Sequence, residues 1–104
     1  MMVQHRELAS GRWAELSLSE QMANIGSEVS RALNWRKKGN DEYSRKAVCR
    51  ALELISLTVN SADRFPLIRE MTRLREALLD YFFGENQFQS SESLWRKYFD
   101  HWIG

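Results

Sequence analysis

Apolar residues recur at intervals of three and four along most of the chain. The first stretch with this spacing carries Leu18, Met22, Ile25, Val29 and Ala32. Residues at these intervals lie along one side of an α-helix, whereas a half-buried strand alternates apolar and polar residues with a period of two. No useful length of the chain alternates in that way, so the sequence predicts an all-α protein.

Four helices are predicted from these stripes and from the residues that start and stop them. Their predicted ranges are 17–38, 41–59, 64–83 and 91–103. Ser17 and Glu20 have the spacing of a capping box at the start of the first helix. Gly39 follows two lysines at its end, where a left-handed residue can stop a helix. Pro66 falls in the first turn of the third helix, where its missing N–H has no partner to lose.

The predicted connections between the helices are short, which is typical of an up-down-up-down four-helix bundle. The chain of 104 residues is expected to form a single domain, with residues 1–16 as a short N-terminal arm docked near Trp13. Gly26 lies inside the first predicted helix, where glycine costs about 1 kcal/mol relative to alanine. We therefore expect another helix to pass close to Gly26.

Three blocks of the sequence carry a resemblance to a known family. They read EQMANIGSEVSRALNW, RALELISLTV and REMTRLREALLDYFFGENQFQSS, the last with KYF further on. Over residues 16–99 the chain resembles a family of small uncharacterised prokaryotic all-helical proteins. The resemblance implies an all-helical fold, and it implies no activity, cofactor or site residue.

A second stripe on the first predicted helix is polar and flanks the apolar one. Polar and charged residues on the next two helices could meet it inside or at the edge of a bundle. We interpret this set as a small pocket for an anionic or zwitterionic ligand, with arginines as forked donors. Ion pairs that only fix the register of the helices are the alternative. The candidate residues are Asn24, Glu28, Arg31, Arg50, Arg75 and Asp80.

The net charge of +1 gives the whole chain no field that would attract nucleic acid or an anionic membrane. Basic residues nevertheless crowd the turn between the first two predicted helices, with Trp35 among them. A basic patch with an aromatic residue can grip a phosphate backbone, which makes a nucleic-acid-binding accessory protein one hypothesis. Cations that complement the helix dipole are the alternative. The basic residues are Arg31, Arg36, Lys37, Lys38, Arg45, Lys46 and Arg50.

The strongest catalytic candidate is Arg96 followed by His101 in the last predicted helix. This spacing resembles that of HEPN domains, a family of helical ribonucleases and toxins, although Lys97 replaces the polar residue they place after the arginine. The resemblance implies RNA cleavage by the pair at a dimer interface. A solvent-facing His101 without a catalytic role is the alternative. Neither His5 nor His101 has a glutamate three residues before it, so we predict no metal site and no cofactor.

The last predicted helix is rich in large apolar side chains. Their combined apolar surface is larger than a small monomer readily buries. We therefore expect a homodimer or a protein partner on this helix, with simple core packing as the alternative. The leading hypothesis is therefore a protein-interaction or small-ligand-binding module that self-associates, and an enzyme is not favoured. The residues are Trp95, Tyr98, Phe99, Trp102 and Ile103.

The sequence also indicates a cellular compartment. It has no apolar signal segment near its start and no apolar run of the roughly 18 residues that a membrane span needs. Its single cysteine, Cys49, is expected to be buried or half-buried, and it cannot form a disulfide within the chain. We therefore expect a cytoplasmic protein with no membrane partner.

Overall fold

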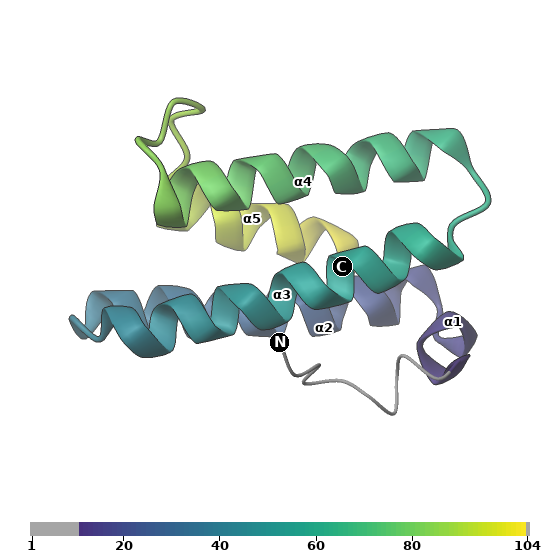
Figure 1. The fold of residues 1–104 in the computed structure, drawn as a ribbon, viewed down its shortest axis with the longest axis horizontal. Helices are drawn as coiled ribbons and strands as arrows, with labels where there is room; N and C mark the ends of the chain where they lie inside the picture. The colour runs from purple at the N-terminus through teal and green to yellow at the C-terminus, as the bar shows by residue number, and fades with distance from the viewer. Residues whose placement is uncertain (1–10, 104) are drawn as a thin grey trace.

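The computed structural model describes residues 11–103, and this part of the chain is helical with no strand. The prediction of an all-α protein is confirmed. Five helices are present in the described residues (Figure 1). They are α1 (Trp13–Glu15), α2 (Leu18–Lys37), α3 (Asp41–Ser61), α4 (Phe65–Phe83) and α5 (Glu92–Ile103).

The start of α2 is fixed by the predicted capping box, which is confirmed. The Ser17 hydroxyl oxygen accepts a hydrogen bond from the Glu20 N–H at 3.1 Å, and the Ser17 N–H donates to Glu20 Oε1 at 2.9 Å. The hydrogen bond that the Ser17 N–H donates to the Glu20 carboxylate is the main cause that lowers the pKa of this carboxyl, because it favours the charged form. Two of the unpaired donors at the helix start are therefore satisfied locally.

The turn between α2 and α3 reverses the chain within three residues. Gly39 has a φ of +80°, a backbone conformation that residues with a Cβ rarely adopt. The Asn40 side chain then accepts a hydrogen bond from the Tyr43 N–H at 3.0 Å and so caps α3. The turn makes α2 and α3 antiparallel neighbours (Figure 1).

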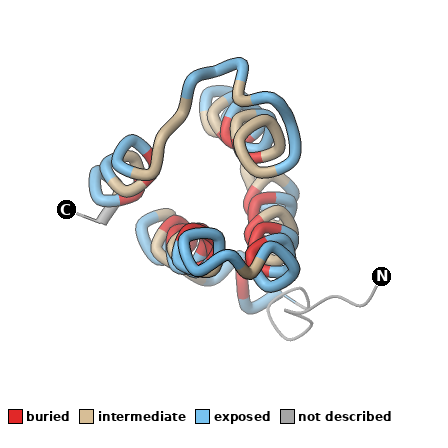
Figure 2. Tube along the Cα trace, turned by 90° about the vertical axis from the view of Figure 1, so that its left-hand side faces the viewer, coloured by how far each residue is buried: buried red, intermediate tan, exposed pale blue. Residues whose placement is uncertain are grey.

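The remaining helices pack on this pair. α5 packs on α2, and α4 packs on α3. The helices are seen nearly end-on in Figure 2, where buried residues face the inside of the arrangement. The core is built from apolar residues of all five helices, among them Trp13, Met22, Leu54, Met71 and Phe99.

The α2–α5 contact is close because Gly26 has no side chain. A Cβ built at Gly26 would lie 3.0 Å from Cγ and Cδ1 of Phe99. Both residues are buried, and the ring therefore lies directly against the backbone of α2. The expected close approach of a helix at Gly26 is confirmed, and the neighbour is α5.

The segment before α2 contains a short helix that the apolar spacing did not predict. Trp13 in α1 is 2% exposed, and its indole N–H donates to the Thr58 hydroxyl on α3 at 3.1 Å. The Gln21 amide on α2 donates to the Trp13 carbonyl at 3.0 Å. These bonds dock the described part of the predicted arm, and residues 1–10 lie outside the described residues.

The expectation of a buried or half-buried Cys49 is wrong, because this thiol is exposed. The inner face of α3 is formed by Ala47, Val48 and Ala51, and residue 49 lies about 100° further round the helix than residue 48. Among the described residues, no helix has the length and hydropathy that a membrane crossing requires.

Candidate anion-binding site on the α2–α3 face

A buried carboxylate holds two arginines on the outer side of the α2–α3 pair. Glu28 Oε1 accepts a hydrogen bond from Arg31 Nη1 at 2.9 Å, and Glu28 Oε2 accepts one from Arg50 Nε at 3.2 Å. The exposed fractions of these side chains are 7% for Glu28, 25% for Arg50 and 60% for Arg31. The negative charge is therefore buried at Glu28, whereas the Arg50 side chain is partly exposed and the Arg31 side chain is open to solvent.

The sequence brings these side chains together through the antiparallel pairing of α2 and α3. Residues 28, 31 and 35 share one face of α2, and residues 43, 46 and 50 share one face of α3, since each set has helical spacing. The turn at 38–40 reverses the chain, so Trp35 pairs with Tyr43 near the turn and Glu28 pairs with Arg50 two turns further along. The site is thus one continuous strip along both helices.

An aromatic corner forms the end of this strip that is nearer to the turn. The rings of Trp35 and Tyr43 meet edge to face, with centroids 4.9 Å apart, and Tyr43 is 45% exposed. Lys38 Nζ lies 5.2 Å from the Trp35 ring centroid, and Lys46 Nζ lies 5.4 Å from that of Tyr43. Such contacts place cations on the negative faces of the rings.

A cleft of about 300 Å³ opens between the aromatic corner and Arg50. It is lined by Trp35, Tyr43, Lys46 and Arg50. Its volume is at the lower end of the range of small-molecule sites, about 300–1,000 Å³. Two rings and two cations therefore face one small space.

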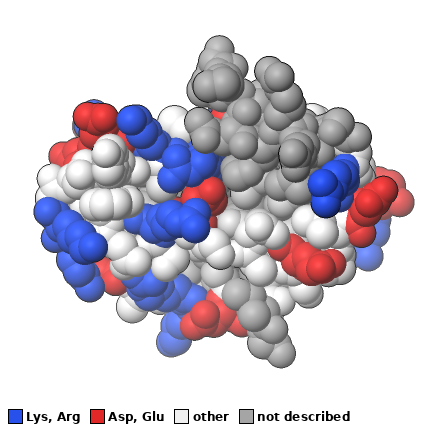
Figure 3. Space-filling view, turned by 90° about the horizontal axis from the view of Figure 1, so that it is seen from below, with Lys and Arg blue, Asp and Glu red and all other residues white. Residues whose placement is uncertain are grey.

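The surrounding surface is rich in cations. Figure 3 views the molecule from the side of α2 and α3, and Lys and Arg side chains gather over its left half, where the turn between the two helices lies. The Glu28 carboxylate occupies only Nε of Arg50 and Nη1 of Arg31. Within the described residues the other nitrogens of these two guanidinium groups make no hydrogen bond, so they remain available as donors to an anion.

Three of the six candidate residues lie outside this cluster, which corrects the expectation that they could meet. Asn24 is exposed and donates to the Glu20 carbonyl of its own helix at 2.8 Å. Arg75 is exposed on α4, which packs on α3 rather than on α2. The carboxylate of Asp80 accepts the Gln87 and Phe88 N–H groups at 2.8 and 3.0 Å and so anchors the loop after α4.

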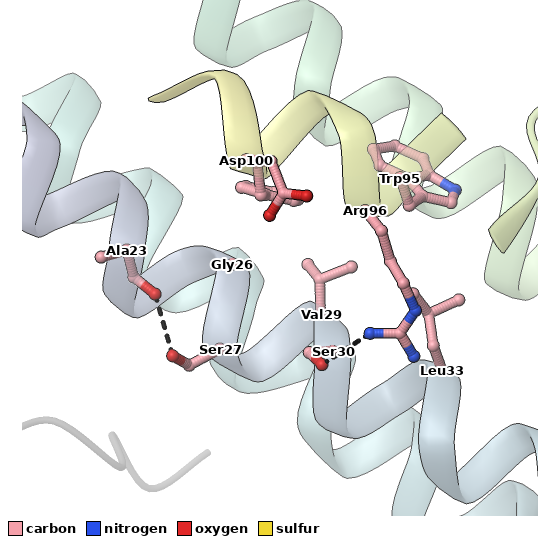
Figure 4. A pocket seen from close by; sticks show the side chains of 10 residues that line it. Ala23, Gly26, Ser27, Val29, Ser30, Leu33, Trp95, Arg96 and Asp100 are labelled. Carbon is pink, nitrogen blue, oxygen red and sulfur yellow. Dashed lines mark hydrogen bonds between the residues drawn. The ribbon is translucent and has the colours of Figure 1, made fainter. Parts of the chain in front are cut away.

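The two residues of the predicted catalytic pair, Arg96 and His101, have different surroundings in the structure. Arg96 donates to Ser30 Oγ and to Asn34 Oδ1 on α2, both at 3.0 Å, and to Glu92 on its own helix. The hydrogen bond from Arg96 is the main cause that lowers the pKa of the Glu92 carboxyl. Figure 4 shows Arg96 reaching from α5 to Ser30, at one wall of a pocket of about 270 Å³ between α5 and α2. Arg96 therefore fastens α5 to α2, while His101 is exposed one turn further along α5.

In the described part of the chain, no group of three or more His, Cys, Asp or Glu side chains could hold a metal ion. Comparison with models of known protein families, with curated proteins and with solved structures found no match. The functional assignment therefore depends on the geometry of the site.

Tyr43 is the site residue that the sequence reasoning missed. The sequence contains the information needed to predict it, because residues equally far from a tight turn face each other in an antiparallel helix pair. Tyr43 is as far after the turn as Trp35 is before it. Lys46 and Arg50 were predicted only as part of a general basic patch and of the polar set.

Proposed function

We propose that the protein binds single-stranded nucleic acid on the α2–α3 face. The observation that carries this proposal is the cleft in which an exposed aromatic corner stands beside two cations, one of them held by a buried carboxylate. Proteins that bind single strands combine this pair of features, because every nucleotide offers a flat base and a phosphate.

The site offers one contact for each part of a nucleotide. The Tyr43 ring, which is 45% exposed, provides a surface for stacking a base. Lys46 and Arg50 line the same cleft and supply donors for the phosphate. The Lys46–Glu42 ion pair is exposed on both sides and so costs little to break when an anion competes for the lysine.

Glu28 acts in this proposal as a positioning residue. Its buried carboxylate holds Arg31 and Arg50, so their guanidinium groups lose less conformational freedom when a ligand binds. The cations near the turn extend the basic surface beyond the cleft, which favours a strand over a free nucleotide.

The proposal includes the arrangement of the helices. We interpret α2, α3, α4 and α5 as an up-down-up-down four-helix bundle, with α1 as the docked end of the N-terminal arm. The support is the short connection between each helix and the next and the packing of α5 on α2 and of α4 on α3. In this arrangement the α2–α3 face is the outside of one hairpin.

Binding is tested by fluorescence anisotropy with a short labelled single-stranded RNA and the matching DNA. Tyr43→Ala removes one stacking surface worth about 1–3 kcal/mol and is expected to weaken binding about tenfold or more. Phe65→Ala, at an aromatic residue that is 76% exposed on α4, is the matched control and leaves affinity unchanged. Absence of binding, or equal losses for the two variants, would contradict the proposal.

The dependence of binding on salt concentration tests the proposed contacts between the basic side chains and the phosphates. Three phosphate contacts, by Arg31, Lys46 and Arg50, give a slope of log K against log salt of about −2 for a single strand, and Lys46→Gln lowers its size by about 0.7. Lys97→Gln, at an exposed lysine on α5, is the matched control and leaves the slope as it is. Duplex RNA and a free mononucleotide complete the series: a strand binds more tightly than either, and tighter binding of the mononucleotide would assign the site to small ligands.

A further inference from the structure

The seam between α4 and α5 is closed by only a few long side chains. α5 packs on α2 and α4 packs on α3, so these two helices are the outer members of the arrangement. The Tyr98 hydroxyl on α5 donates to Glu70 Oε2 on α4 at 2.6 Å, and the Tyr81 and Trp95 rings lie 6.1 Å apart. Burial and the bond to Glu70 together raise the pKa of Tyr98. These bridges leave space between the helices.

That space is a groove that runs along α4. One stretch of about 250 Å³ is lined by residues of α4, α5 and the loop between them, and a second stretch of about 250 Å³ is lined by α4 alone. Both stretches include Glu70 and Arg73, so they are consecutive parts of one groove. Its α4 side extends from Phe65 to Ala77, a length of about 18 Å at 1.5 Å per residue.

The groove has apolar residues that the fold leaves uncovered. Leu94 is 53% exposed and Phe65 is 76% exposed, while Leu74 and Trp95 lie buried beneath the groove as its floor. The indole N–H of Trp95 is buried and has no hydrogen-bond partner among the described residues. The groove therefore combines a buried aromatic floor with exposed apolar side chains at its edge.

The rim of the groove is basic. Arg69 and Arg73 line it and are exposed, and neither forms an ion pair within the described residues. The acidic residue between them, Glu70, is already engaged by the Tyr98 hydroxyl. A partner that lies in this groove would therefore meet an apolar floor flanked by two unpaired cations.

We propose that this groove binds an amphipathic helix of a partner protein, one that carries acidic residues beside its apolar stripe. Amphipathic helices lay their apolar face into apolar grooves, and this groove begins between α4 and α5 and continues along α4. Its length of about 18 Å corresponds to roughly three helical turns. The unpaired Arg69 and Arg73 select the acidic flank. This surface is formed by α4 and α5 and is separate from the nucleic-acid face, which is formed by α2 and α3.

The test uses three labelled synthetic helices and fluorescence anisotropy. The first has a leucine stripe flanked by glutamates, the second has lysines in place of the glutamates, and the third has the composition of the first in scrambled order. The acidic helix is expected to bind about tenfold more tightly than the basic one, as two ion pairs at the rim would give. The double variant Arg69→Glu with Arg73→Glu reverses this preference, whereas Arg45→Glu, at an exposed arginine on α3, leaves it unchanged.

Leu94→Glu separates the groove from a nonspecific charge effect. The side chain is more than half exposed, so the variant folds, and it is expected to lose the acidic helix. Equal binding of the acidic and basic helices, or binding of the scrambled helix, would overturn the proposal. So would sedimentation that shows a dimer which Leu94→Glu dissociates, because the groove would then be filled by a second copy of this chain.

Discussion

Replacing Gly26 with alanine tests the closest contact between α2 and α5. The new methyl would lie 3.0 Å from two ring carbons of Phe99 and 3.1 Å from its Cβ. Carbon atoms pack best at about 3.5–4.0 Å, so the ring and the backbone of α5 must move away by roughly half an ångström. Overpacking of this kind costs about 1–3 kcal/mol, and the better helix propensity of alanine returns about 1 kcal/mol. The expected net loss of unfolding free energy is about 1 kcal/mol.

Urea titration followed by far-ultraviolet circular dichroism measures this loss. Leucine at the same position extends the test, because its helix propensity is close to that of alanine while its overlap with Phe99 is larger. We expect Gly26→Leu to lose several kcal/mol, more than Gly26→Ala. Ser27→Ala, at the exposed neighbour on the same helix, is the matched control and leaves stability nearly unchanged. A rise of about 1 kcal/mol for Gly26→Ala, as for a solvent-exposed glycine, would refute the contact.

Three further substitutions test the bonds that hold the fold. Ser17→Ala removes the capping box and is expected to cost about 1 kcal/mol in thermal or urea unfolding, so an unchanged midpoint would contradict the cap. Thr58→Val leaves the buried indole N–H of Trp13 without its acceptor and is expected to cost about 1–3 kcal/mol, whereas a neutral effect would place Trp13 elsewhere. The pKa of Tyr98 is raised above its ordinary value of 10.0, so the stabilisation is complete below pH 10.0 and falls as the pH rises further. Tyr98→Phe, which removes the bond to Glu70, is expected to flatten the loss of unfolding free energy above that pH, and an equally steep loss in the variant would show that another group causes it.

The features that could be predicted from the sequence depend on residues close together in the chain. The capping box needs only Ser17 and Glu20, and the turn needs only Gly39 and Asn40, so both were visible before any packing was known. The apolar stripes gave the four long helices for the same reason, because periodicity is a local property. The three-residue helix α1 is too short to show a period, and only Trp13 marked it as an anchor.

The candidate site was predictable only in part, because it depends on which helices are neighbours. Glu28 and Arg50 lie on two helices joined by a tight turn, so their meeting follows from the hairpin. Arg75 and Asp80 lie on α4, and nothing in its own sequence states that it packs on α3 and away from α2. The exposure of Cys49, in contrast, follows from helical spacing, because Arg45, Lys46 and Glu53 share its side of α3.

The four tryptophans offer the most direct test of the proposed binding of nucleic acid on the α2–α3 face. Their indole N–H groups give separate signals in a ¹⁵N-labelled sample, and only Trp35 lines the cleft between α2 and α3. On titration with single-stranded RNA, we expect the Trp35 signal to shift in step with binding, while the signals of the buried Trp13 and Trp95 stay in place. A Trp35 signal that does not move, or a shift confined to Trp95 or Trp102 on α5, would contradict the proposed function.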